Sequence, residues 1–172
     1  MGAGGAFSRA LLRQGHYPQP SLHRRLRLSA WARDRVPHSL RGRCIDLHAR
    51  GVAGSPAWYN VNEVTGLDFV VQASLVVNTA AVDAMREAFH YIEDHDIDDF
   101  AFLCQGGTHR SVGCCFLLAA LVYPGAEISL TTPRTCANAV QRGLLPSTRG
   151  GSESPLLVSP SPQTSGSLAS SP

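Results

Sequence analysis

Apolar and polar positions along residues 44–145 follow a pattern that predicts strands and helices in turn. Within 79–95 the apolar residues recur at steps of three and four, which lays one apolar stripe along a helix. The elements expected from the whole pattern are, in chain order, a strand at 44–48, helices at 67–77 and 79–95, a strand at 100–103, a helix at 109–123, a strand at 126–130 and a helix at 135–143. Strands that alternate with helices are typical of an α/β fold, and we expect a small three-layer domain with a short, mostly parallel sheet.

The most informative stretch is the strand, glycine loop and helix that run from Phe100 to Val122. Gly106 and Gly107 separate the two apolar segments, and glycine permits positive φ angles and lets a ligand approach the backbone closely. The start of a helix has free N–H groups and a partial positive charge, which both favour an anion. Arg110 adds a planar fork of donors suited to phosphate or carboxylate. The stretch predicts an anion site, most simply for phosphate, and the alternative is a glycine-rich turn without a ligand.

Charge divides the chain into three parts. Residues 1–43 carry nine arginines and one acidic residue, a net charge of +8, whereas residues 44–145 carry a net charge of −6. We expect 1–43 to be a basic leader, either disordered or an organellar transit peptide, with a nucleic-acid-binding tail as a third alternative. Residues 146–172 are neutral and rich in Ser, Pro and Gly. Such a tail buries too little apolar surface to offset its conformational entropy, so we expect it to be disordered.

The residue types exclude several classes of mechanism. All fifteen basic residues are arginine, so no reaction that depends on a lysine, such as a Walker A loop or a Schiff base, is available. Five cysteines are an odd number and form no Cys-x-x-Cys pair, which argues against a disulfide framework and a structural zinc site. No apolar run approaches the roughly 18 residues of a membrane span. We therefore expect an intracellular protein, cytoplasmic or organellar, with reduced thiols, no metal, no cofactor and no membrane partner.

One chemistry open to the glycine loop uses Cys104 as a nucleophile. Cys104, Gly107, Arg110 and Ser111 fit the spacing Cys-x-x-Gly-x-x-Arg-Ser, which resembles the signature loop of cysteine-dependent phosphatases. A helix start and a nearby arginine would lower the pKa of the thiol, as attack on phosphorus requires. Leu103 stands where those phosphatases usually carry a histidine.

A phosphatase would also need a general acid from another loop. Asp46 and His48 are expected at the carboxyl end of the first predicted strand, the usual ligand edge of an α/β sheet. Asp68 is expected where the next helix begins. Nothing in the sequence singles out either carboxylate as the acid. In the other chemistry open to the loop, it holds a phosphate without attacking it, and Thr108 and His109 supply further donors.

The loop also carries a family resemblance. Residues 104–112, Cys-Gln-Gly-Gly-Thr-His-Arg-Ser-Val, resemble the Cys-Thr-Gly-Gly-x-His-Arg-Ser-Val stretch in the carboxyl-terminal domain of the bacterial RapZ family. Upstream, residues 65–68, Thr-Gly-Leu-Asp, are similar to that family's Thr-Gly-x-Asp segment, and residues 45–47 resemble its first strand. The order of the segments agrees, and the similarity covers roughly residues 44–132.

The resemblance implies a small α/β domain that binds a phosphorylated amino sugar, glucosamine-6-phosphate, in an adaptor protein. The ligand-binding residues that it implies are Cys104, Gly106, Gly107, Thr108, His109, Arg110 and Ser111, together with Asp46 and Asp68. Family members also have a nucleotide-binding domain with a Walker A loop, but this chain has no such motif, so ATP or GTP binding is not expected. RNA binding, a further family property, needs several cations, whereas the segment after the motif offers only Arg134 and Arg142 on an acidic domain.

The hypothesis from the sequence is a binding module for a phosphorylated small metabolite, which acts as a sensor or adaptor. One alternative is a cysteine-dependent phosphatase that uses Cys104 and Arg110. Another is a degenerate domain that keeps the fold for protein contacts alone. Three or four strands make a thin sheet, which a homo-oligomer could complete.

Overall fold

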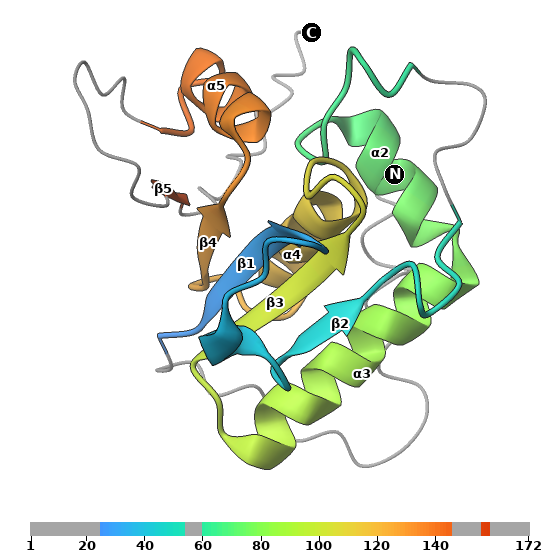
Figure 1. Cartoon of the computed structure of the whole chain (residues 1–172), viewed down its shortest axis with the longest axis vertical. Helices are drawn as coiled ribbons and strands as arrows, with labels where there is room; N and C mark the ends of the chain where they lie inside the picture. The colour runs from blue at the N-terminus through green and yellow to red at the C-terminus, as the bar shows by residue number, and fades with distance from the viewer. Residues whose placement is uncertain (1–24, 54–59, 146–155, 159–172) are drawn as a thin grey trace, which may run out of the picture.

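The computed structural model describes residues 25–53, 60–145 and 156–158. In these residues the chain forms a five-stranded sheet with the strand order β2-β3-β1-β4-β5 (Figure 1). The elements are, in chain order, β1 (Arg27–Ala32), the 3-10 helix η1 (His38–Leu40), β2 (Cys44–Asp46), α2 (Phe69–Val76), α3 (Thr79–His95), β3 (Asp99–Cys104), α4 (Arg110–Leu121), β4 (Glu127–Leu130), α5 (Pro133–Gln141) and β5 (Leu156–Val158). The strands β1 to β4 pair in parallel and β5 pairs antiparallel with β4, which confirms the expected α/β fold with a mostly parallel sheet.

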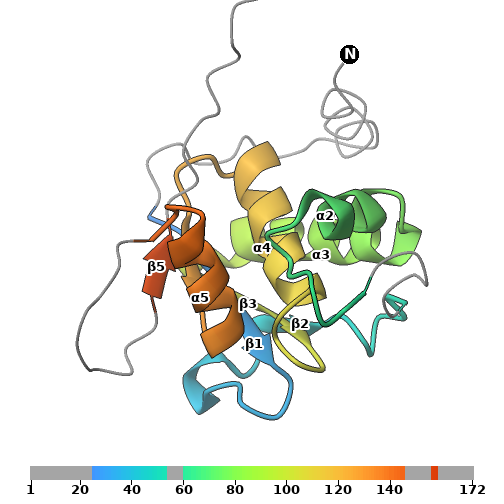
Figure 2. The same cartoon turned by 90° about the horizontal axis from the view of Figure 1, so that it is seen from above.

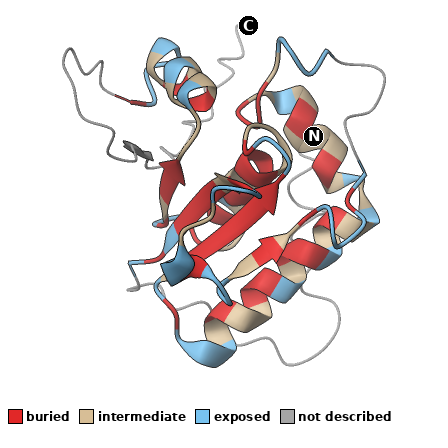
Figure 3. Cartoon of the chain, viewed as in Figure 1, coloured by how far each residue is buried: buried red, intermediate tan, exposed pale blue. Residues whose placement is uncertain are grey.

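The central strand, β1, lies inside the segment that the sequence predicts to be a basic leader. It pairs with β3 on one side and with β4 on the other. The side chains of Leu28 and Ala30 have no exposed surface, and Figure 3 shows the strand buried along most of its length. The boundary at residue 43 is therefore wrong, because the folded unit includes residues 25–43. Exposed arginines at both ends of the strand dominate its composition and conceal its alternating apolar positions.

The predicted tail also contains part of the sheet. Residues 156–158 of β5 extend the sheet at the edge formed by β4, so the expected disorder is wrong for these three residues. The rest of 146–172, like residues 1–24, lies outside the described residues.

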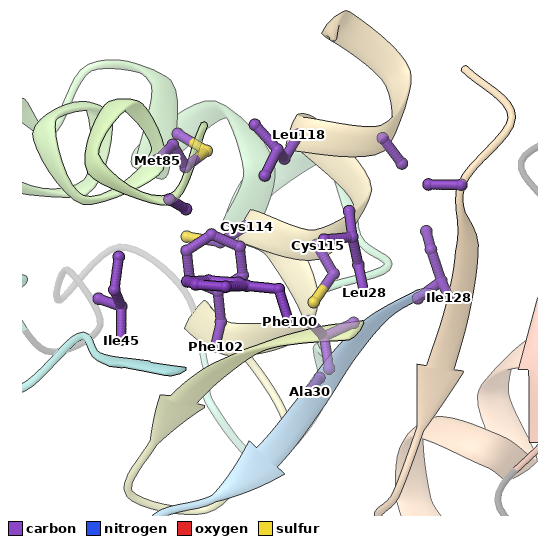
Figure 4. Packing of buried hydrophobic residues seen from close by; sticks show 14 of the residues in the cluster. Leu28, Ala30, Ile45, Met85, Phe100, Phe102, Cys114, Cys115, Leu118 and Ile128 are labelled. Atoms are coloured by element: carbon purple, nitrogen blue, oxygen red, sulfur yellow. The ribbon is translucent and has the colours of Figure 1, made fainter. Parts of the chain in front are cut away.

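The two sides of β3 face layers of different thickness. Phe100 and Phe102 point towards the helices and pack in a core cluster that includes buried side chains from α2, α3, α4 and α5 (Figure 4). Leu103 points to the other side, where Leu40 of η1 and the partly buried Trp31 cover it. Figure 2 shows α2, α3 and α4 on one side of the sheet and the η1 segment on the other. The third layer of the domain is therefore a short loop and one 3-10 turn.

The four predicted helices all form, and each end lies within two residues of its expected position. The amphipathic stripe of α3 accounts for its burial, since Met85, Phe89 and Ile92 pack in the core. α5 begins at Pro133, a first-turn position at which the missing N–H of proline leaves no hydrogen bond unmade. None of the helices in the described ranges is long and apolar enough to cross a membrane.

Shortening the chain tests the corrected boundary. A chain that begins at residue 44 lacks β1 and leaves β3 and β4 without their shared partner. Each large apolar side chain that loses its burial costs about 1.5–3 kcal/mol, against a total stability of about 5–15 kcal/mol for an ordinary domain. We expect this chain to show no cooperative thermal transition by circular dichroism, whereas a chain that begins at residue 25 keeps one. A cooperative transition in both would contradict the central position of β1.

Candidate functional site

The glycine loop, residues 105–109, joins β3 to α4 at the edge of the sheet where β1, β2 and β3 all end (Figure 1). Gly107 has a φ of +64°, and a Cβ atom there would lie 2.5 Å from the backbone nitrogen of Ala32. Only glycine fits this position, because the backbone is left-handed and the neighbouring strand end leaves no space. Gly106 differs, since the nearest atom to a Cβ there would be Thr108 Oγ1 at 3.9 Å. The space beside Gly106 is therefore open.

The loop presents backbone donors that have no partner among the residues the structure describes. No described residue accepts a hydrogen bond from the backbone N–H groups of residues 105–108. The next donors are directed inwards, because the N–H groups of His109 and Ser111 point at Cys104 Sγ. The hydroxyl of Ser111 lies 3.1 Å from the same sulfur atom. The loop thus surrounds one buried sulfur atom with donors and leaves a second set of donors for an outside acceptor.

The donors around Cys104 change its acidity. Burial raises the pKa of the Cys104 thiol, but the hydroxyl and N–H of Ser111, the N–H of His109 and the positive charge of Arg110 together stabilise the thiolate more. The pKa of Cys104 is therefore below its ordinary value. Cys114 and Cys115, in the next turn of α4, behave in the opposite way, because complete burial raises the pKa of both thiols. Cys104 is thus the thiol of this group that the fold favours as an anion.

Among the described residues, Arg110 has hydrogen-bond acceptors for only one of its guanidinium nitrogens. Its Nη1 donates to the backbone oxygen of Val52 at 2.6 Å and approaches that of Ala53 at 3.4 Å. Among the described residues, no acceptor is present for its Nε or Nη2. These two groups form the edge of the fork that binds two phosphate oxygens at once. The contact with Val52 holds the side chain, and the free edge is the part available for an anion.

Two residues predicted as ligand donors have protein partners: His109 contacts the segment 61–64, and the Thr108 hydroxyl contacts the loop itself. His109 Nε2 lies 2.9 Å from the backbone oxygens of both Val61 and Val64, so the ring is protonated at this nitrogen and donates. Arg134 of α5 donates to the same two oxygens at 3.0 and 3.1 Å. The hydroxyl of Thr108 donates to the oxygen of Gly106 at 3.0 Å within the loop.

The carboxylate of Asp68, another predicted ligand residue, also has protein partners. Its carboxylate accepts from the N–H of Thr65 at 2.6 Å and forms an ion pair with Arg142, which directly follows α5. Burial raises the pKa of Asp68, but these partners outweigh it and hold the pKa below the ordinary value. The preceding Gly66 packs against the start of α4, where a Cβ atom would lie 2.3 Å from the oxygen of His109. The segment 65–68 therefore packs against the end of the glycine loop and the start of α4.

Asp46 connects two strand ends at the edge where the loop lies. Its carboxylate accepts from the N–H groups of His48 and Ala49 at 3.0 and 3.4 Å and forms an ion pair with Arg33 at 2.8 Å. Arg33 follows β1, so this ion pair joins the end of β1 to the turn after β2. Asp46 lies at the end of β2, beside the loop, but its carboxylate already binds Arg33 and two backbone N–H groups.

The sequence did not single out the half-open cavity beside the carboxyl ends of the strands. It has a volume of about 620 Å³, and its described lining consists of Arg33, Asp34, His48 and Gln105. Arg33 and Asp34 follow β1, which the composition of the sequence assigns to a basic leader. The sequence therefore gives no indication that these two side chains lie near the loop. Within the described residues, no group of three or more His, Cys, Asp or Glu side chains could hold a metal ion.

Comparison of the chain with protein-family models, with curated proteins and with solved structures finds no match. The resemblance to the RapZ family therefore stays a prediction that rests on the segments 45–47, 65–68 and 104–112.

The two loop glycines provide a matched test of this geometry. We expect Gly107→Ala to lower the free energy of unfolding by about 2 kcal/mol or more, because a left-handed residue with a Cβ costs about 1–2 kcal/mol and the overlap with Ala32 adds to this. Gly106→Ala, with open space around it, should change stability by less than about 0.5 kcal/mol. Urea unfolding followed by circular dichroism measures both. Equal losses in the two variants would be inconsistent with the described loop.

The acidity of Cys104 can be measured directly. The thiolate absorbance at 240 nm, taken as the difference between the wild type and Cys104→Ser, should titrate below the ordinary range of a cysteine. Ser111→Ala removes one donor to the sulfur, so the pKa of Cys104 should rise in this variant. An unchanged titration in Ser111→Ala would show that the hydroxyl does not stabilise the thiolate.

Proposed function

We propose that residues 104–111 bind the phosphate group of a small phosphorylated metabolite. The observation that carries this proposal is the set of N–H groups at 105–108, which have no acceptor among the described residues, together with Arg110 at the start of α4, which uses only Nη1 for contacts with described residues. Backbone donors at the start of a helix and a guanidinium fork are the two groups that proteins most often direct at phosphate. Gly106 lets the oxygen atoms approach the backbone, because the nearest described atom to a Cβ there would be Thr108 Oγ1 at 3.9 Å.

The rest of the ligand is a polar group of modest size. The adjoining cavity has a volume of about 620 Å³, which lies within the range found for small-molecule sites. Its described lining carries a guanidinium, a carboxylate, an imidazole and an amide, which suit a compound rich in hydroxyl groups. No aromatic residue is present in that described lining to stack on a nucleobase. A sugar phosphate fits this chemistry, and glucosamine-6-phosphate is the compound that the resemblance to the RapZ family adds.

The protein that we propose is a sensor or adaptor whose ligand is held by this loop. For such a role, binding alone is sufficient, and it would be communicated through elements that already contact the loop. The segment 61–68 is the nearest of these, since His109, Arg134 and Arg142 all bind it. Binding of a ligand to the loop would therefore change the hydrogen bonds that hold the segment 61–68.

Calorimetric titration with inorganic phosphate and with glucosamine-6-phosphate tests the proposal, with glucosamine as the control without phosphate. Arg110→Ala should weaken phosphate binding by about 1.5–3 kcal/mol, the usual contribution of a charged hydrogen bond. Arg41→Ala is the matched variant, because it removes an exposed arginine beside η1, outside the loop, and should leave the affinity unchanged. Equal phosphate affinity in Arg110→Ala and the wild type would exclude the loop as the anion site.

A further inference from the structure

The helix α2 exposes two large apolar side chains. Phe69, its first residue, is 82% exposed, and Val77, which directly follows its last residue, is 81% exposed. The other large apolar side chains exposed among the described residues, Val61 and Leu144, are each only 37% exposed. Single apolar residues at a surface are ordinary, whereas apolar residues grouped on one element mark a site of interaction.

The sequence of α2 is apolar on two opposite faces. Val71 and Leu75 form the face that is buried in the core. The opposite face, called the outer face of α2 below, consists of Phe69 and the apolar residues four, seven and eight positions after it, Ala73, Val76 and Val77. The helix itself carries no charged residue. A helix that is apolar all round is normally covered on both sides.

The size of the outer face limits what can cover it. A helix of eight residues is about 12 Å long, and even a large aromatic side chain buries only about 150–250 Å². A specific interface between separate proteins buries about 800 Å² on each partner. A segment of the same chain needs less contact, because a short flexible linker holds it at an effective concentration on the order of millimolar. The outer face therefore suits a tethered segment better than a second copy of the chain.

A segment with a matching pattern is present in residues 1–24, which lie outside the described residues. Phe7, Ala10 and Leu11 follow one another at steps of three and one, so a helix would bring them to one face. Arg9 and Arg13, four positions apart, would lie together on the opposite face. The sequence of this segment is thus that of a short amphipathic helix with one apolar and one basic face.

The segment 6–13 can reach α2, and its charge favours the approach. Residues 14–24 link it to the start of the described chain, and eleven extended residues span about 36–40 Å. A domain of this size has a radius of gyration of only about 13 Å. Residues 1–24 contain three arginines and no acidic residue, whereas residues 44–145 have a net charge of −6. The domain therefore attracts the segment electrostatically. Residues 146–155 and 159–172, rich in Ser, Pro and Gly, have no comparable apolar pattern.

We propose that residues 6–13 form an amphipathic helix that docks on the outer face of α2 in the same chain. Phe7 and Leu11 then cover Phe69 and Val77, and the basic face of the segment stays in water. This contact shields apolar surface on both elements, which is the driving force for docking. The docking does not involve the glycine loop, so it stands or fails independently of the phosphate site.

Photo-cross-linking in the full chain tests which segment covers α2. With p-benzoylphenylalanine in place of Phe69, irradiation should yield a product of monomer mass, and mass spectrometry should locate the cross-link within residues 6–13. The yield should not depend on protein concentration, because the contact is within one chain. The same probe in place of Leu144, an exposed apolar residue outside α2, should give no cross-link to residues 6–13.

Limited digestion with trypsin tests the contact without a probe, since Arg9 and Arg13 are cleavage sites within the segment. Docking slows cleavage at both sites, because the protease cuts the open state. Phe69→Ser should raise the rate of cleavage at these sites by about 10-fold, through the loss of a large apolar contact. Cleavage after Arg24, in the linker, should be unchanged and is the internal reference. Leu144→Ser is the matched variant and should leave all these rates unchanged.

Three results would overturn the docking. Cross-links between two chains, with a yield that rises with protein concentration, would assign the outer face of α2 to a second copy. A cross-link from position 69 to residues 54–59 would assign it to that loop instead. Equal cleavage at Arg9 and Arg13 in the wild type and Phe69→Ser would show that the segment does not depend on this face.

Discussion

The parallel pairing of β1 with β3 is the constraint on which the rest of the structure depends. Six residue pairs from Arg27 to Ala32 match Asp99 to Cys104, and the N–H of Arg33 continues the ladder to the oxygen of Cys104 at 2.9 Å. The glycine loop therefore leaves the sheet directly beside the end of β1. This proximity requires glycine at Gly107 and places Arg33 and Asp34 next to the loop. The same pairing thus determines both the shape of the loop and the composition of the cavity.

Most charged side chains around the site stabilise the chain that surrounds the loop. Arg134 of α5 and Arg142, directly after α5, bind the segment 61–68, and Asp46 joins the turns that follow β1 and β2. These contacts satisfy backbone oxygens and carboxylates that would otherwise be costly to leave without partners. What remains for a ligand is a small group: the N–H groups of 105–108, the free edge of Arg110 and the lining of the cavity. Under the proposed function, an acidic domain would bind an anion here mainly through backbone donors.

The environment of Cys104 depends on groups at the α4 end of the loop. Burial alone would give it the raised pKa of Cys114 and Cys115, and the donors of His109 and Ser111 reverse the direction. The sequence spacing of Cys104, Arg110 and Ser111 indicated this arrangement, since a tight loop at a helix start brings the three together. It did not indicate that Arg110 would be held by Val52 or that His109 would turn towards Val61, because those partners are far away in the chain.

The sequence by itself determined the elements whose residues interact locally. The stripe of α3 and the strand, glycine loop and helix around residue 106 depend on neighbours a few positions apart, so their pattern is visible in the chain. The tertiary structure alone decided that β1 lies at the centre of the sheet, that Asp46 and Asp68 are ion-paired, and that His48 faces the cavity. The physical reason is that strand pairing and ion pairs join residues with large separations, such as Arg27 with Asp99 and Asp68 with Arg142, and local composition carries no record of such partners.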